Sequence, residues 1–216
     1  MKPYYEQDGI TIFHGDCRDI LPHLEPVDLV LTDPPYNVGK DYGVWDDALP
    51  ANEYEAVMQV VTTDCLSLAP KQFWVAPRYQ LPMWSRLLEG SHLVVIRRGA
   101  VGPYRGGWSD QFEIALAIGK PSRVLPDLWE DIRLKGEGYF FREDTHGHPG
   151  YTPYPIAARA AGVLSAESQT ILDPFMGSGT TLRAAKDLGR KSIGIEISEK
   201  YCEIAAKRMA QTVMAL

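Results

Sequence analysis

The sequence predicts an α/β fold in which helices cover both faces of a doubly wound, mostly parallel, Rossmann-like sheet. Segments with a strand pattern alternate with segments with a helix pattern along the chain, which is typical of parallel sheets with helical crossovers. Residues 27–32 form a mainly apolar run of the kind found in strands that are buried on both faces. A length of 216 residues suits a single domain around one core.

The first half of the chain contains most of the expected strands. Residues 10–14 alternate between apolar and polar side chains and stop at Gly15. A helix begins at Pro50 or Asn52 and ends before Pro70, because apolar side chains recur on one helical face between them. The remaining elements predicted here are strands 27–32, 72–76, 92–96 and 113–118 and helix 82–88.

Strands and helices alternate again after an irregular stretch at 119–150, which is rich in glycine and proline. A proline opens helix 155–164, and Gly189 closes helix 179–188. The other elements predicted in this half are strands 170–173 and 191–197 and helix 199–209.

The composition is that of an ordinary soluble globular protein, with 45% apolar and 23% charged residues. No run of residues is long and apolar enough to span a bilayer, and the N-terminus lacks the apolar core of a signal peptide. The three cysteines are far apart, which argues against a disulfide framework and against zinc. We therefore expect a cytoplasmic protein with no membrane partner and no metal.

The net charge of −6 is unevenly distributed along the chain. Residues 1–70 carry 3 basic and 13 acidic side chains, residues 71–123 carry 8 and 3, and residues 124–216 carry 11 and 12. A basic middle segment is compatible with a nucleic-acid partner, although a solvated surface is the better interpretation of this feature alone.

The tetrapeptide Asp33-Pro34-Pro35-Tyr36 directly follows the buried run 27–32 and is the most informative feature of the chain. Asp33 supplies a carboxylate acceptor, the prolines stiffen the turn without offering N–H groups, and Tyr36 supplies an aromatic face. Such groups at a strand end suit a flipped-out nucleobase with an exocyclic amine. A stiff surface turn would show the same residues, so this interpretation depends on what lies near the motif.

A second motif, residues 171–181, has the pattern of a strand, a glycine-rich turn and a helix start. Its glycines let the backbone approach a ligand, and the helix start offers free N–H groups to an anion such as a carboxylate. The third glycine of the dinucleotide fingerprint is missing, with Leu182 in its place. Glu196 follows Asp173 by 23 residues, at the end of the next strand, where an acidic side chain can accept both ribose hydroxyls. S-adenosyl-L-methionine fits these features, and NAD fits this part of the chain as well.

Together the two motifs resemble those of the β group of DNA amino-methyltransferases, which modify adenine N6 or cytosine N4. Asp33-Pro34-Pro35-Tyr36 matches the catalytic motif, and Asp173-Pro174-Phe175-x-Gly177-Ser178-Gly179-Thr180-Thr181 matches the cofactor motif. Their order is the circularly permuted order of that group, and the resemblance covers almost the whole chain. It implies S-adenosyl-L-methionine as cofactor and a seven-stranded sheet with a reversed hairpin at one edge. The strands that end at Asp33 and Asp173 would be neighbours in that sheet.

The resemblance also implies the cofactor ligands. Asp16 matches the acidic residue that holds the adenine amino group, and Glu196 matches the ribose ligand. The segment at 148–155 is a poor match, with Tyr154 where lysine is common, and Thr152 is retained there as a contact to the methionine end. The cofactor-binding residues expected are Asp16, Cys17, Asp33, Thr152, Asp173, Phe175, Gly177, Ser178, Gly179, Thr180, Thr181, Glu196 and Ile197.

The implied catalytic residues are Asp33, Pro34, Pro35 and Tyr36. The target nucleotide must leave the base stack before its amine can be reached. The Asp33 carboxylate and the main-chain carbonyl of Pro34 each accept one N–H, which favours a pyramidal nitrogen whose lone pair points at the methyl group. Tyr36 stacks on the base, a contact worth roughly 1–3 kcal/mol. Asp33 acts first as a hydrogen-bond acceptor and second as a proton acceptor.

Double-stranded DNA is the partner that the resemblance implies. We expect the loop at 37–47 to be mobile and to close over DNA and base, although Trp45 would serve equally well to pack that loop. The recognition insertion at 119–150 has only about thirty residues, which predicts a short target site or a homodimer that holds DNA jointly. For any one arginine, a contact to a DNA phosphate or a solvated place on the protein surface is commoner than a contact that reads a base. The DNA-binding candidates are Lys40, Trp45, Arg97, Arg98, Arg105, Arg133 and Lys135.

Adenine N6 is favoured over cytosine N4 because Asp stands at the first catalytic position, where Ser is commoner in the cytosine enzymes. RNA or a protein glutamine amide would keep the same chemistry, but Asn-Pro-Pro-Tyr is expected for the amide. Intact catalytic positions disfavour a degenerate DNA-binding subunit. The missing third glycine disfavours a nicotinamide oxidoreductase.

Overall fold

A computed structural model describes residues 1–97, 112–129 and 153–211 of the chain. Its described strands form one sheet in the order β1-β2-β9-β8-β3-β4-β6-β5-β7. The strands are β1 (Tyr5–Gln7), β2 (Ile10–His14), β3 (Leu29–Thr32), β4 (Gln72–Ala76), β5 (His92–Arg97), β6 (Phe112–Ile118), β7 (Leu128–Trp129), β8 (Thr170–Asp173) and β9 (Lys191–Glu196). The helices are α1 (Cys17–Ile20), α2 (Ala51–Leu68), α3 (Leu81–Leu87), α4 (Tyr154–Leu164), α5 (Thr180–Asp187) and α6 (Glu199–Ala210), with short 3₁₀ turns η1 (Leu21–His23) and η2 (Arg78–Gln80).

The seven central strands confirm the expected doubly wound, mostly parallel sheet. Neighbours from β2 to β4 are parallel, and β6 runs antiparallel between β4 and β5, so the reversed hairpin lies at the predicted edge. β3 and β8 are adjacent and parallel, with Val30 opposite Leu172. β1 and β7 extend the two edges, and they were not predicted because three and two residues are too few to show a period.

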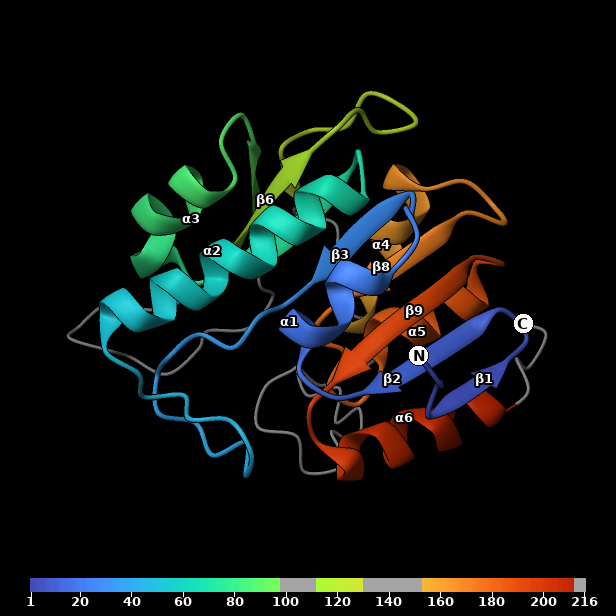
Figure 1. The fold of residues 1–216 in the computed structure, drawn as a ribbon. Helices are drawn as coiled ribbons and strands as arrows, with labels where there is room; N and C mark the ends of the chain where they lie inside the picture. Colours follow the sequence, from blue (N-terminus) through green and yellow to red (C-terminus); the bar gives the residue numbers. More distant parts are fainter. Residues whose placement is uncertain (98–111, 130–152, 212–216) are drawn as a thin grey trace, which may run out of the picture.

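Helices cover both faces of this sheet (Figure 1). The side chains of β4 enter a separate apolar core on each face of the sheet, because successive residues of a strand point to opposite faces. Trp74 packs against Trp84 in the core under α1, α2 and α3, with ring centroids 5.7 Å apart. Phe73 stacks on Trp129 in the core under α4 and α5, with centroids 5.4 Å apart. α6 packs on β2 and β9 beside α5.

Several boundaries differ from the prediction by one or two residues, and two of these differences have a local reason. The predicted strand 27–32 starts at Leu29, since the Asp28 carboxylate accepts hydrogen bonds from the backbone N–H of Thr170 and the side chain of Gln169. The predicted helix 179–188 starts at Thr180, because Gly179 is its N-cap with a left-handed φ of +84°. The hydrogen bonds of Asp28 tie the start of β3 to the start of β8.

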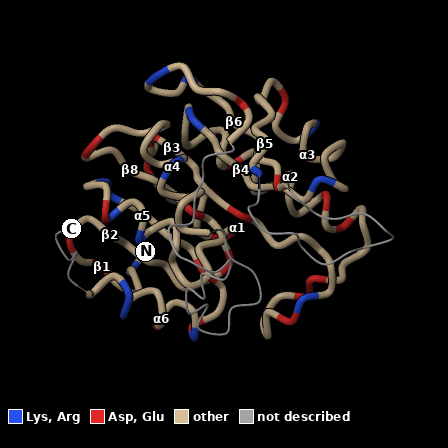
Figure 2. Tube along the Cα trace, turned by 180° about the vertical axis from the view of Figure 1, so that it is seen from behind, with Lys and Arg blue, Asp and Glu red and all other residues tan. Residues whose placement is uncertain are grey.

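Charged residues are mixed over the described surface. In Figure 2 the basic residues are spread over several elements, and they do not gather along one of them. No helix within the described ranges is long and apolar enough to cross a membrane.

Candidate active site

A cavity of about 310 Å³ lies at the carboxyl ends of β3, β8 and β9. Ligands bind at this edge of open α/β sheets, and the volume is within the range of small-molecule sites, roughly 300–1,000 Å³. The cavity joins the two sequence motifs, because β3 and β8 are neighbours. The predicted site residues that line it are Asp16, Cys17, Asp33, Pro34, Pro35, Tyr36, Lys40, Trp45, Asp173, Phe175, Gly177, Ser178, Thr180, Thr181, Glu196 and Ile197.

Two predicted site residues lie elsewhere. Gly179 is not part of the cavity lining, and a Cβ atom there would lie 3.0 Å from the Cβ of Ala205, so its missing side chain lets α5 approach α6. Arg97 ends β5 and is exposed, away from the lining. The predicted residues outside the described ranges are Thr152, Arg98, Arg105, Arg133 and Lys135.

The turn that follows β3 is held by hydrogen bonds from two other elements. The hydroxyl of Tyr54 in α2 donates to the main-chain carbonyl of Pro35 at 2.8 Å. The side-chain amide of Gln80 in η2 donates to the carbonyl of Tyr36 at 2.8 Å. Within the turn, the hydroxyl of Tyr36 donates to the carboxylate of Asp33. These contacts fix the direction of the carboxylate and the ring.

Two further features of this turn concern what a ligand would meet. The carbonyl of Pro34 receives no hydrogen bond from any residue that the structure describes, so it keeps its acceptor capacity. The ammonium group of Lys40 lies 5.7 Å from the centroid of the Tyr36 ring. A base that stacks on this face of the ring must displace that cation.

Asp173 ties the two motifs together. Its carboxylate accepts a hydrogen bond from the Thr32 hydroxyl at 2.7 Å and from the backbone N–H of Phe175 at 3.1 Å. Burial raises the pKa of Asp173 to about 6. This side chain lines the cavity, and its hydrogen bonds also hold the end of β3 against the glycine-rich turn.

Glu196 lies where the glycine-rich turn meets the end of β9. Its two carboxylate oxygens accept hydrogen bonds from the backbone N–H groups of Gly177, at 3.0 Å, and Ser198, at 2.8 Å. Burial raises the pKa of Glu196 to about 7. The turn passes closely over β9, since a Cβ atom at Gly194 would lie 2.4 Å from the sulfur of Met176. Glycine at this position is therefore required by the close approach.

Asp16 and Arg18 form a pair at the start of α1. The Asp16 carboxylate caps the helix by accepting the Arg18 backbone N–H at 2.9 Å, and it also binds the Arg18 guanidinium at 2.5 Å. That hydrogen bond lowers the pKa of Asp16. Burial raises the pKa of the neighbouring Cys17 to about 12, so its thiol stays protonated at neutral pH and is no nucleophile.

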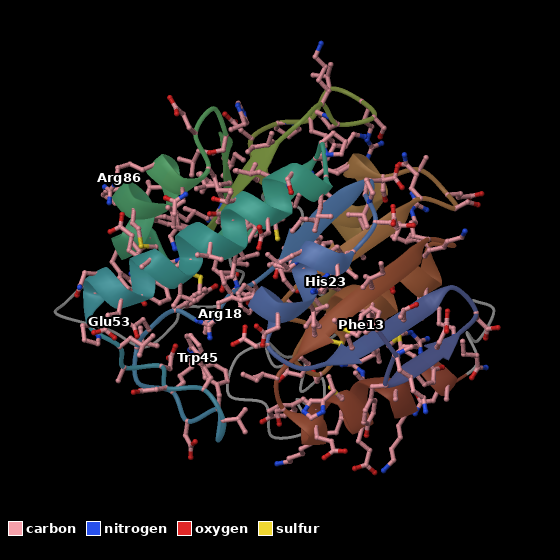
Figure 3. All side chains as sticks on the ribbon, viewed as in Figure 1. Phe13, Arg18, His23, Trp45, Glu53 and Arg86 are labelled. Atoms are coloured by element: carbon pink, nitrogen blue, oxygen red, sulfur yellow. The ribbon has the colours of Figure 1, made fainter. Side chains whose placement is uncertain are left out.

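Four of the lining residues that were not predicted as site residues carry polar side-chain groups. Arg18, Tyr42, Glu113 and Tyr201 come from α1, the loop after β3, β6 and α6. Figure 3 labels Arg18, which lies at the same end of the molecule as Trp45. No spacing marks these residues, because each reaches the cavity from a different element.

The cavity fits an adenosine-containing cofactor by its chemistry. Carboxylates at Asp16 and Glu196 offer acceptors to amino and hydroxyl groups, and Phe175 and Ile197 offer apolar surface. Thr180 and Thr181, at the start of α5, line the same space, and a helix start offers free N–H groups to an anion.

Comparisons with known proteins agree with this site. The family model N6_N4_Mtase, described as DNA methylase, matches residues 115–207, which include the whole cofactor motif. The Type II methyltransferase M.ScaI of Streptomyces caespitosus is 27% identical over 100% of this chain and 86% of its own length. M.HpaI of Haemophilus parainfluenzae is 26% identical over 85% of this chain and 68% of its own. Residues 115–207 thus match the DNA N6/N4 methyltransferases, and the chain as a whole is similar to Type II methyltransferases.

Solved structures show the same fold. The PvuII DNA methyltransferase, described as cytosine-N4-specific, matches with a TM-score of 0.76 at 17% identity. The match covers 99% of this chain and 91% of the PvuII chain. M1.HpyAVI in complex with SAM has a TM-score of 0.70 at 22% identity, over 94% of this chain and 100% of its own. M1.HpyAVI was solved with SAM, the cofactor that the resemblance implied for this chain.

Replacing Tyr54 by Phe is expected to slow methyl transfer about tenfold. The change leaves the Pro35 carbonyl without its buried donor, which costs roughly 1–3 kcal/mol and loosens the turn that follows β3. Single-turnover rates with labelled cofactor measure the effect. The matched control is Tyr5→Phe, which removes a hydroxyl from edge strand β1. An unchanged rate in Tyr54→Phe would show that this hydrogen bond does not support catalysis.

Proposed function

We propose that this methyltransferase methylates the N6 amino group of a flipped-out adenine in double-stranded DNA. The observation that carries the proposal is the Asp33 carboxylate, which lies in the same cavity as the cofactor motif of β8 and β9. Asp at this position favours adenine. The DNA adenine methyltransferase YhdJ of Escherichia coli supports that preference, with 24% identity over 95% of this chain and 84% of its own length.

The catalytic turn supplies the groups that prepare the amine. S-adenosyl-L-methionine, when bound, supplies an electrophilic methyl group. The Asp33 carboxylate and the Pro34 carbonyl each accept one N–H of the amine, which turns its lone pair toward the cofactor. The Tyr36 hydroxyl occupies one oxygen of Asp33 and so orients the other. After transfer the nitrogen is positively charged, and its proton passes to Asp33.

We propose separate ligands for the ribose, the adenine and the methionine part of the cofactor. Glu196 accepts hydrogen bonds from the ribose hydroxyls. Asp16 accepts a hydrogen bond from the adenine amino group once Arg18 has released one of the Asp16 carboxylate oxygens. Thr180 and Thr181 hold the carboxylate of the methionine part at the start of α5. The remaining proposed contacts are Cys17, Asp33, Thr152, Asp173, Phe175, Gly177, Ser178 and Ile197.

DNA is proposed to approach the side of the cavity formed by the loop after β3. Lys40 and Trp45 line the cavity there, so they can reach a base that enters it. We propose a single domain with a small recognition insertion at 119–150, and a homodimer as the form that compensates for the short insertion. The further DNA contacts proposed are Arg97, Arg98, Arg105, Arg133 and Lys135.

One experiment tests the activity and the target base. Purified protein is incubated with tritiated S-adenosyl-L-methionine and unmodified DNA, which is then digested to nucleosides and separated. Label in N6-methyladenine is the expected result. Label in N4-methylcytosine would select the second candidate, cytosine N4 methylation, which is the specificity described for the PvuII enzyme. Label in RNA or protein but not in DNA would refute both.

A further inference from the structure

The loop between the catalytic turn and α2, residues 37–49, is built around one buried carboxylate. Asp47 is only 2% exposed. Its carboxylate accepts three backbone N–H groups, from Asn37 at 2.8 Å and from Val38 and Lys40 at 3.0 Å. An ionised carboxylate is a strong acceptor for such groups, so Asp47 defines the path of the backbone that precedes it.

The two ends of the loop are also joined. The Asn37 side-chain amide donates to the carbonyl of Leu49, and the Leu49 N–H donates back to Asn37, both at 2.8 Å. The carbonyl of Asp47 accepts the Gly39 N–H at 2.7 Å. A loop whose ends meet and whose interior is hydrogen-bonded is a compact Ω-type loop and has a defined conformation.

This loop forms one wall of the cofactor cavity. Lys40, Tyr42 and Trp45 line the cavity, and Glu196 and Tyr201 line it from β9 and α6. Figure 1 shows the loop and the start of α6 at the same end of the sheet. The loop therefore faces the cofactor ligands as well as the catalytic turn.

Two aromatic side chains of this wall are suited to contact a bound molecule. Burial and the nearby carboxylates, among them Asp33 and Glu196, raise the pKa of Tyr42, so its hydroxyl remains a donor at neutral pH. The indole N–H of Trp45 is buried and has no acceptor among the described residues. A buried donor without an acceptor is unfavourable, so Trp45 gains from an acceptor that a ligand brings.

We propose that Asp47 is a positioning residue for the cofactor. By gathering three backbone N–H groups it holds Tyr42 and Trp45 as a wall against bound S-adenosyl-L-methionine. The proposal rests on the proposed place of the cofactor in this cavity, and it does not depend on which base is methylated.

The test is the affinity for S-adenosyl-L-homocysteine without DNA, measured by isothermal titration calorimetry. Asp47→Asn keeps the size of the side chain but replaces one acceptor oxygen by an amide nitrogen. We expect its Kd, and its KM for S-adenosyl-L-methionine, to rise about tenfold, with a much smaller change in KM for DNA. The matched control is Asp46→Asn, since Asp46 is exposed and its carboxylate accepts, from the described residues, only the Ala48 N–H at 3.0 Å. A Kd within about twofold of wild type, or a rise confined to KM for DNA, would overturn the proposal.

A second variant keeps the test decisive if Asp47→Asn does not fold. Trp45→Phe removes the unsatisfied indole N–H but keeps an aromatic ring and leaves Asp47 in place. We expect the Kd to rise threefold to tenfold, roughly the effect of losing one hydrogen bond, while the thermal midpoint stays unchanged. An unchanged Kd would overturn the proposed wall. Wild-type protein that binds no cofactor analogue would refute the cavity as the cofactor site, whereas methylated cytosine would refute only the proposed base.

Discussion

Asp33→Ala is expected to abolish methyl transfer and to leave cofactor binding almost unchanged. The carboxylate is the acceptor that prepares the amine, and removal of one such group typically costs about a hundredfold to a thousandfold in rate. Asp33 accepts the Tyr36 hydroxyl just after β3, whereas the Glu196 carboxylate accepts its N–H groups at the end of β9. Single-turnover rates with labelled cofactor, together with the Kd of S-adenosyl-L-homocysteine, measure the two expectations.

Two further variants separate the functions of this turn. Asp33→Asn keeps the shape and one acceptor oxygen but loses the charge, so its rate should lie between those of the Ala variant and wild type. Tyr36→Phe keeps the stacking ring and removes the hydroxyl that orients Asp33. Asp33 is also a proposed cofactor contact. If Asp33→Ala loses cofactor binding as well, binding is its main role and the catalytic assignment is wrong.

Cofactor affinity is expected to fall as pH is lowered through about 7. Burial raises the pKa of Glu196 to about 7, so this carboxyl becomes protonated in that range. A neutral carboxyl is a weaker acceptor for ribose hydroxyls, and charge-assisted hydrogen bonds are roughly twice as strong as neutral ones. The Kd of S-adenosyl-L-homocysteine between pH 6 and pH 8.5 measures the effect. Glu196→Gln should bind more weakly at pH 8 and lose this pH dependence.

The stability of the free protein should change in the opposite direction over the same range. The pKa values of Glu196 and Asp173, about 7 and about 6, lie above the ordinary values of 4.5 and 3.8. Their contribution to stability is therefore complete below the ordinary values and is lost as pH rises through about 6 to 7. Lowering the pH from 8 to 6 should weaken cofactor binding while these two groups raise the thermal midpoint. If both quantities fall together, unfolding and not Glu196 explains the loss of affinity.

Long periodic segments and motifs at strand ends were predictable from the sequence. The seven central strands were assigned correctly because each carries an apolar run, whereas α1, with four residues, is too short to show a period. Asp33 and Glu196 were placed in one cavity because parallel strands bring their carboxyl ends together. Gly179 was expected at the cofactor and instead lies against Ala205, since the same absence of a side chain serves either purpose.

The supports of the site could not be predicted in the same way. Tyr54 and Gln80 act through single hydrogen bonds to main-chain carbonyls 19 and 44 residues away, and such contacts follow no sequence period. Asp47 was part of a loop predicted from its glycines and aromatics, but its buried carboxylate resembles any surface acid in the sequence. These side chains become visible only once the tertiary structure is known.

The hydrogen bond from Thr32 to Asp173 has a consequence for how the protein folds. It joins residues 141 positions apart, and the pairing of β2 with β9 spans a still longer segment. Contacts of such high sequence separation form slowly, because a long loop must close first. During synthesis the catalytic turn emerges about 140 residues before the strand that completes its cavity. A nascent chain therefore carries the proposed methyl-transfer turn for most of its elongation before the proposed cofactor cavity can form.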